Sequence, residues 1–257
     1  GRGRERRPRP GRAGRRGPGR SGAHAGRAME TPAAAGSGAV RKITASYDEG
    51  YYRSREATRD FAIEAELLYR LLAPGPDSRV LEVGCGGGAF LSFLEEHGHR
   101  PTGVDVLEEA LEAARRIAPS SEVLAADAAR LPFADGAFDR LVSQHLVEHL
   151  EDFSGTLAEW RRVLAPGGVM AICTPNRLYP CPSLFDDPGH VHVYEPAELR
   201  RAVEEGGFAV RECLTVFPHL WKGKISVWVG VPLYRPLMRL PRFRERGRSL
   251  LLSAVKP

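Results

Sequence analysis

The sequence contains no apolar run long enough to cross a bilayer. A spanning helix needs about 18 consecutive apolar residues, and the chain of 257 residues has none; the apolar stretch Ile225–Tyr234 is bounded by Lys224 and Arg235. This argues against an integral membrane protein. A peripheral contact with a membrane surface stays possible.

Cysteine is scarce and shows no functional spacing. None of the four cysteines belongs to a Cys-x-x-Cys pair or to the His/Cys pattern of a metal site. This argues against a disulfide-stapled secreted fold and favours a reducing cytoplasm as the location. We therefore expect no metal site. The cysteines are Cys85, Cys173, Cys181 and Cys213.

The first 28 residues lack leucine, isoleucine, valine and every aromatic residue. They hold ten arginines and one glutamate, a local charge of +9 against a total of +5, which leaves −4 for residues 29–257. Such a segment cannot bury a core, so we expect a disordered leader over 1–40 and a folded domain over 41–257. Three interpretations stay open: a phosphate-attracting nucleic-acid arm, a transit peptide, and a translated stretch ahead of a start at Met29. We base no function on this leader and expect no nucleic-acid partner.

Strands and helices alternate through the rest of the chain. This alternation predicts the α/β class: a doubly wound, Rossmann-like three-layer sandwich with helices on both faces of a parallel sheet. The expected strands cover 79–83, 100–105, 122–125, 138–143, 169–174, 208–216 and 249–255. The expected helices cover 55–72, 89–97, 107–118, 154–164 and 196–205.

Three acids lie at or near the ends of the first three expected strands. Glu82 comes two residues before a glycine-rich turn, 84–88, which lets the backbone approach a ligand closely. Asp105 ends the second strand and can accept both hydroxyls of a ribose, and Asp127 follows the third and can accept from an exocyclic amine. Because ligands of such sheets bind at the carboxyl ends of the strands, these acids predict a nucleoside site with a partner for a cationic group.

These residues resemble the class I S-adenosylmethionine-dependent methyltransferases. The resemblance runs over about residues 47–207, and its later motifs are most similar to the subgroup of ubiquinone-biosynthesis methyltransferases. It implies a seven-stranded, mostly parallel sheet with an antiparallel last strand, and S-adenosylmethionine as cofactor. The motifs are LEVGCGGG (81–88), GVDV (103–106), AADAARLPF (125–133), FDRLVSQHLVEHL (138–150), LAPGGVMAICTPN (164–176) and GHVHVYEPAEL (189–199).

The resemblance also implies which residues contact the cofactor. Ser143 and Gln144 would lie near the transferred methyl, while Tyr47 and Tyr51 would belong to a lid. Asp127 has an alternative role, capping the turn that follows it. The implied contacts are Glu82, Gly84, Cys85, Gly86, Gly88, Asp105, Val106, Asp127, Ala128, Ser143, Gln144 and Tyr51.

The mechanism implied is direct transfer of a methyl group from a sulfonium, in which positioning and water exclusion supply most of the rate. A hydroxyl acceptor also needs a general base, for which neutral histidine is suited near pH 7. His145 and His149 are the catalytic candidates, although His149 has the alternative of a structural bond within its turn. His190 and His192 lie two apart and would point the same way if extended, without an apparent third metal ligand.

Basic and apolar residues interleave in an insert at about 221–246. A lid over an apolar substrate, contact with a membrane surface and a packed excursion between two strands all stay open for it. The segment carries several lysines and arginines among its apolar residues.

The sequence therefore predicts a methyltransferase that acts on an oxygen or carbon of a small molecule. No Asn-Pro-Pro-Tyr-like stretch follows the fourth strand, as amino-group methyltransferases carry there. One alternative is an NAD(P)-dependent oxidoreductase on a Rossmann fold, against which stand Glu82 and the absence of a Tyr-x-x-x-Lys pair. Another is an RNA or protein methyltransferase guided by the arginine-rich leader.

Overall fold

The computed structural model describes residues 59–181, 187–218, 240 and 245–257. The leader over 1–40, both lid tyrosines (Tyr47 and Tyr51) and most of the insert at 221–246 lie outside the described residues. The expectations for those segments therefore stay predictions.

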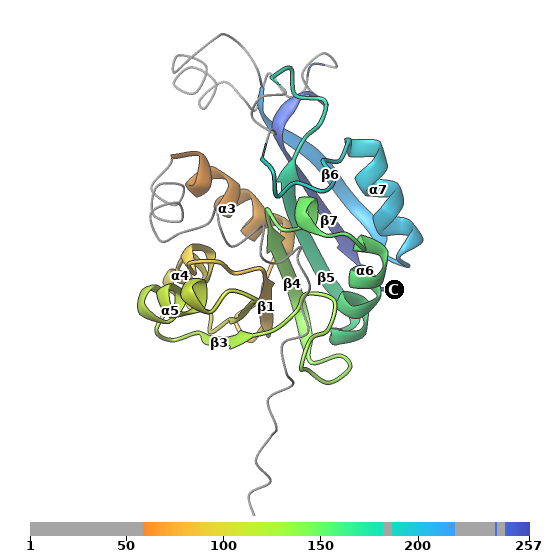
Figure 1. Ribbon diagram of the computed structural model, residues 1–257. Coiled ribbons are helices and arrows are strands. Elements are labelled where there is room, and N and C mark those ends of the chain that lie inside the picture. The colour runs from red at the N-terminus through yellow and green to blue at the C-terminus, as the bar shows by residue number, and fades with distance from the viewer. Residues whose placement is uncertain (1–58, 182–186, 219–239, 241–244) are drawn as a thin grey trace, which may run out of the picture. The chain divides into compact units, whose positions relative to one another are not determined.

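The strands form one sheet in the order β3-β2-β1-β4-β5-β7-β6 (Figure 1). The first five strands in this order pair in parallel, and β7 pairs antiparallel with both β5 and β6. The expected doubly wound sheet with an antiparallel last strand is confirmed. The strands are β1 (Val80–Val83), β2 (Thr102–Asp105), β3 (Glu122–Ala125), β4 (Phe138–Gln144), β5 (Leu164–Pro175), β6 (Ala209–Pro218) and β7 (Gly247–Val255).

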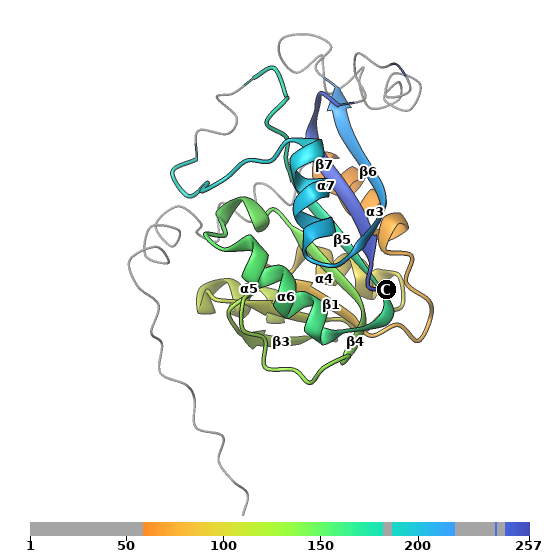
Figure 2. The same ribbon diagram turned by 90° about the vertical axis from the view of Figure 1, so that its right-hand side faces the viewer.

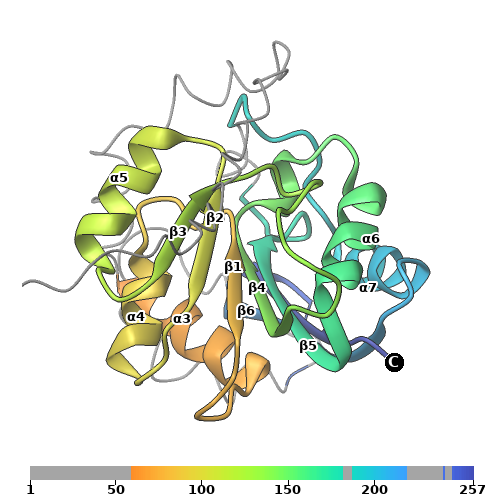
Figure 3. The same ribbon diagram turned by 90° about the horizontal axis from the view of Figure 1, so that it is seen from below.

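Helices cover both faces of this sheet. Seen from below, α3, α4 and α5 lie on one side and α6 and α7 on the other (Figure 3). Figure 2 shows the same layers with α6 and α7 in front of the sheet and α3 and α4 behind it. Within the described residues, every helix is too short or too polar to cross a membrane. The helices are α3 (Arg59–Leu72), α4 (Ala89–Glu96), α5 (Glu108–Ile117), α6 (Phe153–Val163) and α7 (Pro196–Glu205), with the 3₁₀ turn η1 (Val147–His149).

Two apolar clusters hold these layers together. On one face Leu68 of α3 packs with Val142 of β4, and on the other Trp160 of α6 packs with Leu141 of β4. The neighbours Leu141 and Val142 are both fully buried, because a parallel sheet is covered on both sides. Packing on both faces therefore holds the strands in place, and with them the residues at their carboxyl ends.

The observed strand β5 begins five residues earlier than the sequence predicts. The amide of Gly167 donates to the Lys256 carbonyl at 2.8 Å, and the Lys256 amide donates to the Gly168 carbonyl at 3.0 Å. The Pro-Gly-Gly segment, which local sequence marks as a turn, is thus joined to the C-terminal end of β7. A long-range pairing extends the strand past its local boundary.

Candidate functional site

The glycine-rich turn connects β1 to α4. Gly84 and Gly88 have φ angles of +77° and +88°, which residues with a side chain rarely adopt. A Cβ on Gly88 would lie 2.7 Å from the Ala114 Cα of α5. The amides of Gly84 and Cys85 donate to the Val104 carbonyl of β2 at 2.8 and 3.0 Å. The turn is therefore held against the neighbouring strand and helix in a way that requires glycine.

Asp105 ends β2 and is bonded to this turn. Its Oδ2 accepts from the Gly86 amide at 2.9 Å, and its Oδ1 accepts from the Leu107 amide at 3.0 Å. Burial raises the pKa of Asp105, although these amide bonds act in the opposite direction. Each oxygen keeps a second lone pair, so the oriented carboxylate can accept two hydroxyls. The adjacent Val106 side chain is 48% exposed, which suits an apolar side chain that a planar base would cover.

The other two acids have different surroundings. Glu82, within β1, is only 2% exposed. Asp127 is exposed, and its Oδ1 accepts from the Ala129 amide at 2.9 Å, which is the turn-capping role that the sequence left open. Ala128 is buried, and its carbonyl accepts from the Trp160 indole at 3.1 Å.

The end of β4 carries two buried polar side chains. Ser143 is fully buried, and its hydroxyl has no hydrogen-bond partner among the residues that the structure describes. The Gln144 side-chain amide donates to Glu64 Oε2 of α3 at 3.2 Å. A buried hydroxyl without a partner is costly, so Ser143 is a natural place for a polar group of a ligand.

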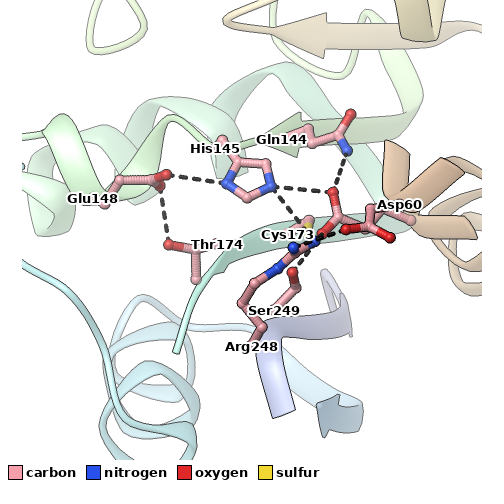
Figure 4. A network of polar contacts seen from close by, with 9 residues as sticks. Asp60, Gln144, His145, Glu148, Cys173, Thr174, Arg248 and Ser249 are labelled. Carbon is pink, nitrogen blue, oxygen red and sulfur yellow. Dashed lines mark hydrogen bonds and ion pairs between the residues drawn. The ribbon is translucent and has the colours of Figure 1, made fainter. Parts of the chain in front are cut away.

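His145, the next residue, lies between two buried carboxylates (Figure 4). Its Nε2 is 3.2 Å from Glu64 Oε2, and its Nδ1 is 3.3 Å from Glu148 Oε1. Its φ is +55°, and its amide donates to the Cys173 carbonyl of β5 at 2.7 Å. The Cys173 sulfur is 3.8 Å from the same Nε2. Both ring nitrogens of His145 are thus held by groups from other elements.

Glu64 reaches this histidine from α3. Its second oxygen accepts from the Ser249 hydroxyl of β7, and the Arg248 guanidinium is 3.9 Å away. Burial by itself raises the pKa of Glu64, but His145, Ser249 and Arg248 together lower it to about 2. Arg248 also pairs with Asp60 at 2.8 Å. The network therefore joins α3 to the last strand.

Glu148, in η1, holds the other side of the histidine. Its Oε2 accepts from the Thr174 hydroxyl at 2.9 Å. Burial by itself raises the pKa of Glu148, but the contacts with His145, together with His149 and a backbone hydrogen bond, lower it. The Glu148 carbonyl accepts from the amides of Val191 and His192 at 2.8 and 3.0 Å. These two bonds bend the loop before α7 over η1.

That bend separates the histidines of the loop. His149 Nδ1 is 2.9 Å from the Gly189 carbonyl, and its ring centroid is 4.9 Å from that of His190. His192 instead contacts Glu198 Oε1 at 2.7 Å. The extended loop in which His190 and His192 would point the same way is not found here, because the loop is bent and the two histidines contact different residues. Since a carbonyl only accepts, the neutral form of His149 carries its proton on Nδ1 and is basic at Nε2.

Comparison with known proteins connects this geometry to a family. The model of a methyltransferase domain matches residues 81–172, the segment from β1 into β5. A Mycolicibacterium smegmatis protein named "Probable S-adenosylmethionine-dependent methyltransferase" is 34% identical over 155 residues, covering 59% of this chain and 60% of that protein. Over the segment that holds the glycine turn and Asp105, the chain is thus similar to S-adenosylmethionine-dependent methyltransferases.

Other similar proteins of this kind vary in what they methylate. A malonyl-[acyl-carrier protein] O-methyltransferase of Serratia marcescens is 34% identical over 116 residues, covering 44% of this chain and 46% of that protein. The chain thus spans about half to three fifths of the length of these relatives. A Streptomyces coelicolor geranyl diphosphate C-methyltransferase, solved with Mg²⁺, geranyl diphosphate and S-adenosyl-L-homocysteine, shares the fold at TM-score 0.58 and 18% identity, covering 76% of this chain and 77% of that one.

The residues of this segment fit the cofactor of such methyltransferases, S-adenosylmethionine. The glycine turn lets a ligand approach the backbone closely. A Cβ at Gly88 would displace this turn, because it would lie 2.7 Å from the Ala114 Cα. Asp105 presents an oriented carboxylate for a ribose, and the exposed Val106 can flank an adenine. Glu82 and Ser143 add buried polar groups at the neighbouring strands.

Sequence reasoning missed part of the network around His145. Glu64 did leave a signal, because it lies three residues after Phe61 and four before Leu68 on the apolar face of its helix. A carboxylate on such a face is rarely buried unless it is paired. Cys173 and Arg248 left none, since only the pairing of β4, β5 and β7 brings them to the site.

Proposed function

We propose that this chain binds S-adenosylmethionine at the carboxyl ends of β1 to β4 and transfers its methyl group to an oxygen or carbon of a small molecule. The observation that carries this proposal is the Asp105 carboxylate, which two backbone amides orient next to the glycine turn. We also propose a cytoplasmic location, on the cysteine pattern of the sequence.

The proposal gives each element of the site a task. When bound, the cofactor supplies an electrophilic methyl group on a sulfonium. Glu82 faces its cationic amino-acid end, Asp105 accepts from its ribose, and Val106 flanks its adenine. The proposed contacts are those that the resemblance implies: Glu82, Gly84, Cys85, Gly86, Gly88, Asp105, Val106, Asp127, Ala128, Ser143 and Gln144, with Tyr51 outside the described residues.

Calorimetry with S-adenosylhomocysteine tests this assignment. The wild type should bind it and should give no heat with NADH. Asp105→Asn should bind about 10- to 100-fold more weakly, because a hydrogen bond to a charged group contributes about 1.5–3 kcal/mol. The control is Asp77→Asn, an exposed acid in the turn before β1, which should bind like the wild type. Absence of heat with S-adenosylhomocysteine, or equal affinities for both variants, would refute the proposal.

An oxygen or carbon acceptor is supported by the names of the relatives. Among them are the O-methyltransferase that acts on malonyl-[acyl-carrier protein] and the C-methyltransferase that acts on geranyl diphosphate. The end of β4 carries Ser143, Gln144 and His145 at the place where amino-group methyltransferases have an Asn-Pro-Pro-Tyr-like stretch. The likeness of the later motifs to ubiquinone-biosynthesis methyltransferases supports the same acceptor class.

Removal of a proton from a hydroxyl acceptor falls to His149 in this proposal. The Gly189 carbonyl holds its Nδ1, so the neutral ring is basic at Nε2. His145 has both nitrogens next to carboxylates, and we assign it a positioning role at the end of β4.

A further inference from the structure

Three potential metal ligands from distant parts of the chain meet behind the end of β4. They are Glu64 Oε2 of α3, His145 Nε2 after β4, and the Cys173 sulfur of β5, and all lie within 4.8 Å of one another. Figure 4 shows the His145 ring pointing toward Cys173. We propose that these three residues bind a zinc ion. This inference does not rest on the proposed function.

The spacing of the ligand atoms suits zinc. A tetrahedral zinc ion, with bonds of about 2.0–2.1 Å to nitrogen and about 2.3 Å to sulfur, separates its ligand atoms by about 3.3–3.6 Å. The His145 Nε2 is 3.2 Å from Glu64 Oε2 and 3.8 Å from the Cys173 sulfur. These two distances lie within a few tenths of an ångström of that range, and Glu64 Oε2 lies within 4.8 Å of the Cys173 sulfur.

The groups around the three ligands are those that zinc sites use. A metal-bound histidine usually gives its other ring N–H to a carboxylate, and His145 Nδ1 is 3.3 Å from Glu148 Oε1. Glu148 is itself held by the Thr174 hydroxyl at 2.9 Å. On the other side, the Ser249 hydroxyl holds the second oxygen of Glu64. Both the histidine and the carboxylate are thus oriented before a metal arrives.

The ligand types select zinc over magnesium or calcium. Thiolate and imidazole prefer zinc, whereas magnesium and calcium take oxygen ligands. Glu64 Oε2 also accepts from the Gln144 amide at 3.2 Å, and a carboxylate oxygen has a second lone pair for the metal. Three protein ligands leave the fourth position for water or another oxygen ligand. The ligands stand at positions 64, 145 and 173, a spacing that no short motif reveals.

A cobalt titration of the full chain, freed of any tag and stripped with chelator, tests the site. Co²⁺ bound to a thiolate gives a sulfur-to-cobalt charge-transfer band, which identifies Cys173 as a ligand. We expect one equivalent of Co²⁺ with this band, displaced by one equivalent of Zn²⁺. Cys173→Ser should lose the band. Cys213→Ser, which changes a half-buried cysteine of β6, should keep it.

A further variant tests the carboxylate that orients the histidine. Glu148→Gln should keep the band and bind Co²⁺ about 10- to 100-fold more weakly, as loss of such a partner does in known metal sites. The proposal is overturned if no Co²⁺ binds, which would leave His145 paired with its two carboxylates through protons alone. It is also overturned if Co²⁺ binds without the charge-transfer band and the His190→Ala variant no longer binds it. The metal would then occupy a second group of potential ligands, whose ligand atoms also lie within 4.8 Å of one another: Glu148, His149 and His190.

Discussion

At the scale of single residues, the site is built from side chains whose polar atoms are held by neighbouring groups. Two backbone amides orient Asp105, and two carboxylates hold the ring of His145. His149 is held at Nδ1 by the Gly189 carbonyl. Such fixed groups suit a reaction whose rate depends on positioning.

Replacement of His149 tests its assignment as the base. His149→Gln should lower kcat with a hydroxyl acceptor by about 10²- to 10⁴-fold, the usual contribution of general-base catalysis, and leave S-adenosylhomocysteine affinity unchanged. The measurements are steady-state kinetics and calorimetry. His97→Gln is the matched control, since His97 is exposed and its Nδ1 also contacts a carbonyl, that of Phe93 at 2.7 Å. Equal kcat values for the two variants would contradict the assignment.

At the scale of elements, the turn between β1 and α4 depends on a backbone that only glycine tolerates. Gly88 and Gly98 have almost the same left-handed φ, +88° and +85°. Their surroundings differ: a Cβ on Gly88 would meet the Ala114 backbone at 2.7 Å, whereas a Cβ on Gly98 would have nothing within 4 Å. The pair therefore separates the cost of backbone strain from the cost of close packing.

Alanine at these two positions should destabilise the fold to different extents. Gly98→Ala should lower the free energy of unfolding by about 1–2 kcal/mol, the cost of a side chain in the left-handed region. Gly88→Ala should lose about 1–3 kcal/mol more, because α4 and α5 must separate to admit the methyl group. Urea unfolding at equilibrium measures both. Equal losses of unfolding free energy in the two variants would show that the contact with α5 adds no cost at position 88.

At the scale of the whole molecule, an ion pair joins the first described helix to the last strand. Arg248 of β7 contacts Asp60 of α3 at 2.8 Å, with side chains 30% and 16% exposed. The guanidinium also lies 4.7 Å from the centre of the Phe217 ring. Arg248 thereby links β7 to α3, the helix that also carries Glu64.

A double-mutant cycle on this pair should show coupling. Asp60→Asn and Arg248→Met together should give a coupling energy of about 1–3 kcal/mol in urea unfolding, because partly buried pairs are weakly screened. The exposed pair Arg115 and Glu108, 2.7 Å apart with side chains 45% and 59% exposed, should couple by less than about 1 kcal/mol. Similar values for both cycles would show that burial does not strengthen the link.

The sequence by itself determined the layer order, the glycine turn and the position of Asp105. These follow from the periodicity of apolar residues and from local backbone preferences, both of which depend on residues that are close in the sequence. The start of β5 and the bend that parts His190 from His192 depended on bonds to distant backbone, to Lys256 and Glu148. Only the tertiary structure brought Glu64, His145 and Cys173 together, because their meeting depends on how α3, β4 and β5 pack, and residue spacing along the chain does not record that distance.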